Sequence, residues 1–189
     1  MNMEQHGLPL VIVVAAVSGG GKTTITNHLQ ETLPECKALF FDDYDFDGPD
    51  DMMQWIENGC KPEEWNLSPL VVEMKKLLSE PLDYIIVDFP FAYLHRETRN
   101  LIDFAVFIDT PLDLAMARRM MRDHGSSSSA DIRMDMESYI KRGRQGYLAM
   151  LDTVKLNSDF IVDGTQSIPG IASAIIEKIK SAKEGRISE

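Results

Sequence analysis

The stretch Ala16-Val17-Ser18-Gly19-Gly20-Gly21-Lys22-Thr23-Thr24 joins two segments with different hydrophobic patterns. Before it, residues 10–14 form an uninterrupted aliphatic run, which is typical of a parallel strand buried on both faces. After it, apolar residues recur every fourth position from Ile25 to Leu33, which indicates one face of a helix that Pro34 ends. A strand, a glycine-rich turn and a helix in this order predict a loop that binds phosphate groups.

The residues of this loop have separable expected roles. Glycines let the backbone turn its N–H groups toward a phosphate chain, and the helix behind them adds the positive end of its dipole. Lys22 is expected to reach the β- and γ-phosphates of a nucleotide, and the Thr23 hydroxyl to ligate Mg²⁺. The predicted nucleotide-binding residues are Ser18, Gly19, Gly20, Gly21, Lys22, Thr23 and Thr24. The usual pattern G-x-x-x-x-G-K-[ST] has glycine in place of Ala16, and the alternative interpretation is a merely flexible turn.

Length and composition indicate one globular domain and exclude several classes of protein. The chain has 189 residues, of which 44% are hydrophobic, enough for a single core. Its formal charge of −11 argues against a nucleic-acid partner, since such surfaces cluster Lys and Arg against phosphates. No run approaches the roughly 20 apolar residues of a membrane-spanning helix, and the residues before Leu10 lack the pattern of a secretion signal. Cys36 and Cys60 have no metal-ligand spacing, so we predict free thiols, a cytoplasmic protein and no membrane partner.

Six aspartates are concentrated in residues 42–51, directly after a predicted strand at residues 37–41. Most of them fit a solvated acidic loop with a helix cap at Pro49-Asp50. Asp42 and Asp43 differ, because they follow the carboxyl end of a predicted parallel strand, where open α/β sheets bind ligands. If the strand geometry persists, these two carboxylates should point in different directions. Which of them acts in chemistry stays open at this point.

Residues 83–88 read Asp-Tyr-Ile-Ile-Val-Asp, an apolar strand that ends in a carboxylate. This is the form of the Walker B strand, whose terminal acid holds Mg²⁺ through water opposite the loop threonine. Asp88 and Thr23 are therefore the predicted metal-site residues. The alternative is that Asp88 caps the N-terminus of a following helix.

Basic residues flank a low-complexity segment, the serine run at residues 126–129. The helix predicted before it and the helix predicted after it each carry a basic cluster, which together contain Arg118, Arg119, Arg122, Lys141, Arg142 and Arg144. Two such helices joined by a mobile turn predict a lid, at about residues 118–144, that closes cations onto phosphates. The alternative is a basic hairpin in solvent.

The remaining apolar runs complete an alternation of strands and helices. Further strands are predicted at residues 104–109 and 159–162, and a closing helix carries Ile171, Ile175 and Ile179. This alternation predicts an α/β fold with a doubly wound parallel sheet of five strands.

Several of these motifs together resemble one group of enzymes. Gly21-Lys22-Thr23-Thr24 and Phe41-Asp42-Asp43-Tyr44 resemble the start of nicotinamide riboside kinases. Phe107-Ile108-Asp109-Thr110, together with Arg118-Arg119 and Arg122-Asp123, is similar to uridine kinases. Both families belong to a P-loop kinase superfamily that also includes phosphoribulokinase, and the resemblance extends over residues 11–162.

The resemblance implies both a fold and a reaction. It implies the sheet order 2-3-1-4-5, a single domain over residues 1–189 with an acceptor-site insertion at about 42–66, and Mg²⁺-dependent transfer of the ATP γ-phosphate to a hydroxyl of a small-molecule acceptor. By position, Asp42 corresponds to the acid that accepts the hydroxyl proton, and Asp88 to the metal-binding acid. Arg119 and Arg122 correspond to the lid arginines. The predicted catalytic residues are Asp42, Lys22, Arg119 and Arg122.

Two departures from the family bear on the acceptor. Asp88 is followed by Phe89-Pro90, whereas the family has glutamate followed by glycine. The aspartate that holds the ribose hydroxyls in uridine kinases corresponds to Cys60, and a thiol cannot replace a bidentate acceptor. A nucleoside-like acceptor is expected, but its identity is left open, as is the formation of a homo-oligomer.

The leading hypothesis is an ATP-dependent small-molecule kinase. The alternative is a nucleotide-binding NTPase or regulator that keeps the loop and has lost the acceptor site, an interpretation to which Ala16 and Cys60 lend support. A nucleotide kinase of the adenylate type is disfavoured, because the aspartates of residues 42–51 would repel a phosphorylated acceptor.

Overall fold

A parallel β-sheet forms the centre of the molecule. The structure is a computed structural model that describes residues 7–187, so the ends of the predicted domain, residues 1–6 and 188–189, lie outside the described residues. Within this range five strands form one sheet in the order β2-β3-β1-β4-β5, and all neighbours are parallel. The strands are β1 (Leu10–Ala15), β2 (Cys36–Phe40), β3 (Tyr84–Asp88), β4 (Phe104–Asp109) and β5 (Phe160–Asp163). The predicted sheet and its order are confirmed.

Helices connect these strands and cover the sheet. The α-helices in the described range are α1 (Lys22–Thr32), α2 (Met52–Glu57), α3 (Ser68–Leu77), α4 (Leu112–Asp123), α5 (Ser129–Ser138), α6 (Arg144–Asp152) and α7 (Ile168–Ile187). Short 3₁₀ turns are η1 (Phe41–Asp43), η2 (Pro62–Glu64), η3 (Ala92–Leu94), η4 (Arg99–Leu101) and η6 (Lys155–Asn157), and η5 (Tyr139–Gly143) is a π-helical turn. In residues 7–187, no helix combines the length and apolar character that crossing a membrane requires.

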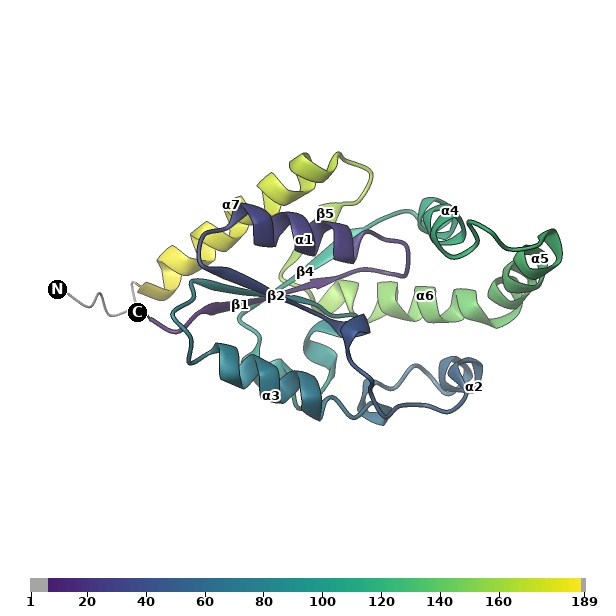
Figure 1. The fold of residues 1–189 in the computed structure, drawn as a ribbon, viewed down its shortest axis with the longest axis horizontal. Helices are drawn as coiled ribbons and strands as arrows, with labels where there is room; N and C mark the ends of the chain where they lie inside the picture. The colour runs from purple at the N-terminus through teal and green to yellow at the C-terminus, as the bar shows by residue number, and fades with distance from the viewer. Residues whose placement is uncertain (1–6, 188–189) are drawn as a thin grey trace.

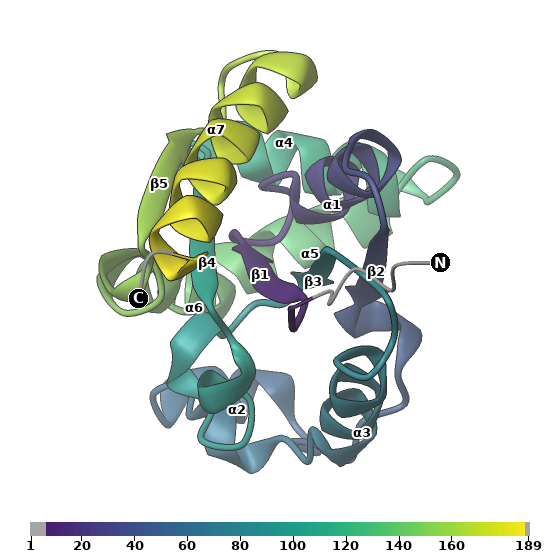
Figure 2. The same ribbon diagram turned by 90° about the vertical axis from the view of Figure 1, so that its left-hand side faces the viewer.

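Alternation along the strands divides the core between the two faces of the sheet. In β1, Val11, Val13 and Ala15 pack toward the side of α3 and α6, whereas Leu10, Ile12 and Val14 pack toward α1 and α7. Figure 2 shows α1 and α7 on one face of the sheet and α3 on the other. All six residues of β1 are buried, which explains its uninterrupted aliphatic sequence.

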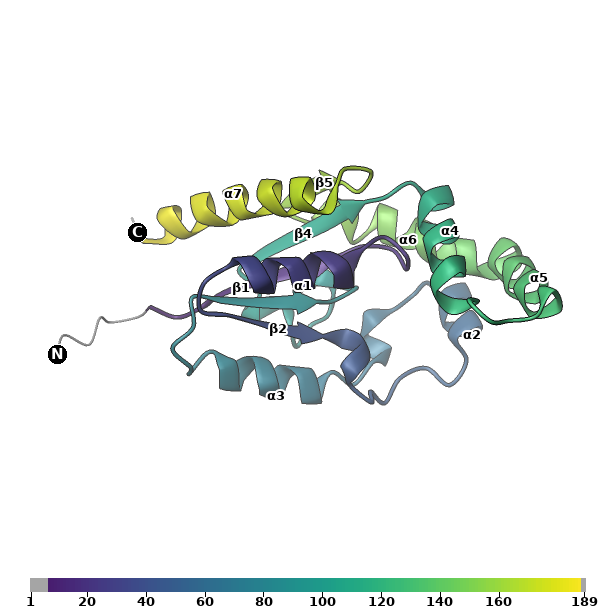
Figure 3. The ribbon, with the colours of Figure 1, turned by 45° about the horizontal axis from the view of Figure 1, so that its top comes forward.

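The carboxyl ends of the strands point toward a group of less buried helices. Figure 1 shows α2, α4 and α5 beyond this edge of the sheet, at the end of the molecule opposite the start of β1. Figure 3 shows α4 passing in front of the α6 region and α5 extending farther from the sheet. Ligand sites in open α/β folds lie at this edge, so these helices surround the expected site.

The end of β2 differs from the sequence-based prediction. β2 ends at Phe40, and η1 follows it, so Asp42 lies in a 3₁₀ turn instead of ending the strand. The two side chains were predicted to point in different directions if the strand continued through them. The strand does not continue in this described segment, so that condition is not met.

The cap of α2 also differs from its predicted position. Asp51, rather than Pro49-Asp50, caps α2, and its carboxylate accepts hydrogen bonds from two backbone N–H groups. Pro111 is the N-cap of α4, and α3 begins at Ser68. Cys36 and Cys60 are free thiols, as predicted.

Candidate functional site

The glycine-rich loop connects β1 to α1, as the sequence predicts. Gly19 and Gly21 have φ values of 78° and 103°, a left-handed conformation that favours glycine. A Cβ on Gly19 would lie 2.0 Å from the carbonyl oxygen of Ala115, so the loop also packs closely against α4. The Gly20 carbonyl accepts a hydrogen bond from the Thr110 hydroxyl at 2.9 Å. Glycine is therefore required in this loop by both its backbone conformation and its close packing.

Ala16 fits the position where the usual pattern has glycine. It is 1% exposed and lies among the buried residues on the α1 side of the sheet. Its φ is not among the positive values found for non-glycine residues in the described range, so its Cβ causes no backbone strain there. A Cβ on Gly20, by contrast, would lie 2.7 Å from the Ala16 Cβ. The departure at Ala16 is thus compatible with the loop conformation.

Lys22, Thr23 and Asp88 converge at the start of α1. The Thr23 hydroxyl donates to Oδ2 of Asp88 at 2.6 Å, and Nζ of Lys22 lies 3.3 Å from Oδ1 of the same carboxylate. Asp88 is 3% exposed. In the described segment that follows Asp88, residues 89–103 contain only 3₁₀ turns, so no α-helix is present for Asp88 to cap. The structure therefore brings together the residues predicted to form the metal site and removes the capping alternative.

The donors at this point suit a hard divalent cation. Mg²⁺ prefers oxygen ligands and keeps several waters or phosphate oxygens, so a protein hydroxyl and one carboxylate are sufficient protein ligands. Thr23 and Asp88 supply these two oxygens at hydrogen-bond distance from each other. In residues 7–187 there is no group of three or more His, Cys, Asp or Glu side chains arranged as a metal site. The site is thus suited to a metal that is held jointly with a phosphate ligand.

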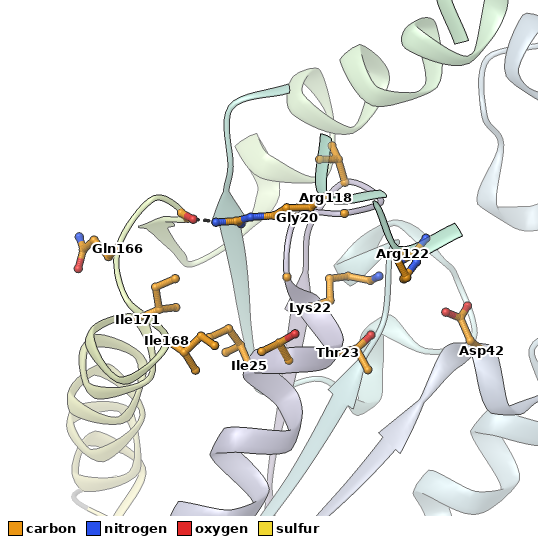
Figure 4. Close-up of a pocket in the computed structure, with 15 residues that line it drawn as sticks. Gly20, Lys22, Thr23, Ile25, Asp42, Arg118, Arg122, Gln166, Ile168 and Ile171 are labelled. Carbon is orange, nitrogen blue, oxygen red and sulfur yellow. Dashed lines mark hydrogen bonds between the residues drawn. The ribbon is translucent and has the colours of Figure 1, made fainter. Parts of the chain in front are cut away.

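A cleft of about 680 Å³ runs along the loop and the start of α1. Lys22, Arg122 and Asp42 lie toward one end of it, and Gln166 and Ile168 lie at the other (Figure 4). The cleft is large enough for a nucleotide, with Lys22, Arg122 and Asp42 at one end and the isoleucines of α7 at the other. This polarity matches a ligand with a phosphate chain at one end and an apolar ring at the other.

Asp42 is the carboxylate of the acidic segment that lines this cleft. It projects from η1 on the same side as Lys22 and Arg122 (Figure 4). Asp43, by contrast, is not among the described residues that line the cleft. The neighbouring Tyr44 hydroxyl donates to Glu73 of α3 at 2.7 Å. The structure therefore favours Asp42 over Asp43 as the carboxylate near a reacting group.

The arginines of α4 occupy different positions. Arg118 spans the cleft, with Nη1 3.4 Å from the carbonyl oxygen of Gly164 (Figure 4). Arg122 also lines the cleft, is 62% exposed, and donates from Nε to Asp123 at 2.7 Å. Arg119 is bound to Asp135 of α5 and is not among the described residues that line the cleft. The predicted pair Arg119 and Arg122 is thus divided, and Arg118 takes a place beside Arg122.

The sequence-based site lacks the residues at the apolar end of the cleft. These are Gly164 and Gln166, from the connection between β5 and α7, and Ile168 and Ile171, from the first turn and a half of α7. Ile171 was assigned to a core helix face, and it is both buried and in contact with the cleft. A signal was present at Gly164, since glycine after a strand-ending aspartate indicates a close approach. A Cβ there would lie 1.9 Å from Oγ1 of Thr110.

Two further residues from the sequence analysis, Ser18 and Cys60, are not among the described residues that line the cleft. Ser18 is exposed. Cys60, which the resemblance places where uridine kinases have a ribose-binding aspartate, has a φ of 54°, and its thiol lies 3.9 Å from the Ile56 carbonyl oxygen. Burial raises the pKa of this thiol. Cys60 therefore provides no charged acceptor in the region where the family has one.

Known proteins resemble this chain in both sequence and fold. No model of a known protein family matches the sequence. The chain is 26% identical over 176 residues to a uridine kinase of Borrelia hermsii, covering 80% of this chain and 85% of that protein. A gluconokinase from Sinorhizobium meliloti has a similar structure, with a TM-score of 0.58, 16% identity and coverage of 96% of this chain and 98% of that one. A sugar kinase from Janibacter sp. gives a TM-score of 0.54 at 17% identity, covering 91% and 95% of the two chains.

These similarities agree with the expectations drawn from the residues. The resemblance to uridine kinases is confirmed by the relatives in sequence, and the α/β kinase fold is confirmed by the structural neighbours. The relatives in sequence confirm the predicted enzyme class, a small-molecule kinase. The names of these proteins refer to different acceptors, so these proteins share a class of reaction but not an acceptor.

Proposed function

We propose that this chain transfers the γ-phosphoryl group of ATP to a hydroxyl of a small, nucleoside-like metabolite. The single observation that carries the proposal is that Asp42 and Arg122 share one cleft with Lys22 and the glycine-rich loop. A site that only bound nucleotide would need the loop and Lys22, but would have no use for a carboxylate on the far side of the phosphates. The relatives named as uridine kinases support a nucleoside-like acceptor.

The residues of the cleft divide the work of phosphoryl transfer. Lys22 places a positive charge on the β- and γ-phosphates, and the loop N–H groups hold the phosphate chain. Asp42 orients the acceptor hydroxyl and takes its proton, while Arg122 neutralises charge that develops on the transferring group. Thr23 and Asp88 would hold Mg²⁺, which supplies additional positive charge to the phosphates when it is bound.

The proposal extends to the surroundings of the cleft. Residues 42–66 form the acceptor side, residues 118–144 form a lid, and the protein acts in the cytoplasm on ATP and a small molecule. Apolar residues around Ile168 support a purine ring at the opposite end. Arg122 is largely exposed and is paired with the adjacent Asp123. This supports a role for Arg122 in the lid, where it can leave the Asp123 carboxylate and bind a phosphate instead.

A second function is favoured by one specific observation. Cys60 provides no charged acceptor for ribose hydroxyls and lies apart from the described cleft residues. A nucleotide-binding NTPase or regulator without an acceptor would be consistent with this loss. The two functions differ in whether ADP release depends on an added hydroxyl compound.

A coupled assay of ADP release over a panel of acceptors distinguishes these functions. The panel contains uridine, cytidine, nicotinamide riboside, gluconate, pantothenate and shikimate, each with ATP and Mg²⁺. We expect ADP release to rise with one of these compounds and to be lost in Lys22→Ala. ADP release that is equal with and without every compound would contradict a kinase and favour the NTPase.

A further inference from the structure

Arg119 and Asp135 lie at the centre of a polar network that joins three helices. Arg119 of α4 donates hydrogen bonds to both carboxylate oxygens of Asp135 on α5. Its Nε lies 3.6 Å from Oδ2 of Asp123, and its Nη1 lies 3.5 Å from the hydroxyl of Tyr147 on α6. Nε2 of His124, the C-cap residue of α4, lies 2.9 Å from Oδ2 of Asp135. One carboxylate of α5 thus binds two side chains of α4.

Apolar packing contributes little to the placement of α4 and α5. Within the described chain, α4 buries a single residue, Ala115, and α5 buries none. Met121 of α4 and Met134 of α5 are 80% and 68% exposed. A helix is ordinarily held by a buried apolar stripe; α4 has Ala115 and a few half-buried apolar residues, and α5 has no buried residue in the described chain. The orientation of α5 relative to α4 therefore depends strongly on the polar contacts between them.

The contact between Arg119 and Asp135 has the properties of a strong ion pair. Nη2 of the guanidinium contacts both oxygens of the Asp135 carboxylate, and hydrogen bonds between two charged groups are stronger than those between neutral groups. The side chains are 17% and 27% exposed, so water screens them less than it screens Arg122. Hydrogen bonds from Arg119 and His124 hold the pKa of the Asp135 carboxyl below its ordinary value, which keeps it charged. The pair can therefore fix one helix against the other.

The orientation of α4 matters because its other side faces the nucleotide cleft. Arg118 and Arg122 are one turn apart and both line the cleft. Arg119 lies about 100° farther around the helix axis than Arg118, since an α-helix has about 3.6 residues per turn. Binding Arg119 to α5 therefore sets the rotation of α4 about its own axis, and with it the direction of Arg118 and Arg122.

We propose that Asp135 is a positioning residue for phosphoryl transfer, which holds Arg119 and His124 so that Arg118 and Arg122 face the nucleotide cleft. The proposal rests on the proposed kinase function for its kinetic consequence, but not for its structural one. It places Arg119 inside the lid as a contact between helices, and leaves Arg122 to interact with the phosphoryl group.

Hydrogen exchange of the free protein tests the structural part without any turnover. Asp135→Asn keeps the shape of the side chain and removes its charge. Glu137→Gln is the matched control, because Glu137 is an exposed acid on the same helix. We expect exchange over residues 116–138 to accelerate on the order of tenfold in Asp135→Asn, with β1 and β3 unchanged and with no acceleration in Glu137→Gln. Equal exchange in the two variants would overturn the proposal.

Kinetics test the positioning part. The rate of ADP release is measured with the acceptor found in the panel or, if none is found, with water as the acceptor. Binding of AMP-PNP with Mg²⁺ is measured separately by calorimetry. We expect Asp135→Asn to lower kcat by a factor on the order of 10 to 10², with a smaller loss of AMP-PNP affinity. Asp135→Glu should recover part of the rate. A kcat equal to the parent value, despite accelerated exchange, would overturn the positioning role.

A double-mutant cycle separates a specific pair from general destabilisation. If Arg119 acts through Asp135, then Arg119→Gln combined with Asp135→Asn should be no slower than the worse single variant. Multiplicative losses in the double variant would show that Arg119 acts on the substrate by itself and would overturn the assignment. If the parent protein shows no acceptor-dependent turnover, the proposed function is contradicted but the role of Asp135 is not. Hydrogen exchange and the slow reaction with water still test that role.

Discussion

β1 and α5 lie at opposite extremes of burial in this molecule. All six residues of β1 are buried, and it pairs with β3 on one side and β4 on the other. α5 buries none of its residues within the described chain, and its charged contact to α4 runs through Asp135. The sheet is stabilised by apolar burial that no single charge controls, whereas the lid depends on a few ionic contacts. The glycine-rich loop joins the two regions, because it continues β1 and packs on α4 at Ala115.

The sharpest way to break the site without breaking the sheet is Lys22→Ala. Loss of the charge on the phosphates should reduce turnover by about 10³-fold or more, with little change in the melting temperature. The measurement is ADP release together with thermal unfolding. Lys37→Ala is the matched control, because Lys37 lies in β2 and pairs with Glu80 far from the loop. Turnover of Lys22→Ala at the parent rate would show that the loop is not the nucleotide site.

Asp42→Asn tests whether the acidic segment takes part in the chemistry. We expect it to reduce kcat by a factor on the order of 10² to 10⁴, the usual size of a lost general base, and to change ATP affinity only a few-fold. Asp43→Asn is the control, since Asp43 shares the turn η1 but not the described cleft. A loss confined to Asp43→Asn would identify that residue as the base. Full activity in both variants would remove this role from the segment.

The contrast in burial itself can be tested by stability. Ile86→Ala in β3 should lower the free energy of unfolding by about 2 to 5 kcal/mol, because its side chain is fully buried. Met134→Ala in α5 should change it by less than about 0.5 kcal/mol. Chemical denaturation followed by circular dichroism measures both. Similar losses in the two variants would mean that the lid shares the cooperative core.

Arg122→Ala should affect the reaction more than the binding of ATP. If this exposed arginine reaches the transferring group only when the lid closes, kcat should fall by a factor of about 10², with a smaller change in nucleotide affinity. Steady-state kinetics and calorimetry with AMP-PNP provide the two values. Arg133→Ala, on the exposed surface of α5, is the control. A loss seen only in affinity would place Arg122 in ground-state binding.

The smallest expected effect concerns the metal. Asp88→Asn should raise the Mg²⁺ concentration for half-maximal activity by about tenfold, since an amide oxygen is a weaker ligand for a hard cation. Titration of Mg²⁺ at saturating ATP measures it. Asp83→Asn at the other end of the same strand segment is the control, because Asp83 pairs with Lys183. An unchanged Mg²⁺ requirement would assign Asp88 to holding Lys22 and Thr23.

Most of the fold could be predicted because its signals are local. The aliphatic run of β1 and the helical repeat of Ile25 and Leu29 predict buried residues, and these residues are buried in the structure. The glycines predict the turn between the two segments. The structure places Asp88 beside Lys22 and Thr23, as the strand pattern predicts, because parallel strands deliver their carboxyl ends to one edge. The sequence analysis predicted a strand up to Phe41, whereas Phe41 and Asp42 lie in a 3₁₀ turn. The prediction of the conformation failed because a 3₁₀ turn and a strand end have similar local sequence patterns.

The lid shows the limit of such prediction. Three arginines lie on the predicted helix, at positions 118, 119 and 122, and the residue type does not distinguish them. Their spacing shows only that Arg118 and Arg122 share a helix face. Which face meets the cleft depends on Asp135 and Tyr147, which come from other helices. The residues at the apolar end of the cleft were likewise missed, because the connection after β5 is brought to the loop by a tertiary contact, the packing of Gly164 on Thr110.

The sequence by itself determined the order of strands and helices, the phosphate-binding loop and the acids at the strand ends, because each depends on neighbouring residues and on the periodicity of burial. The tertiary structure alone decided which arginines enter the cleft, that Asp42 faces it, and that Arg119 binds Asp135. These outcomes depend on the rotation of a weakly buried helix and on contacts between segments far apart in the chain, and neither is encoded in a local pattern.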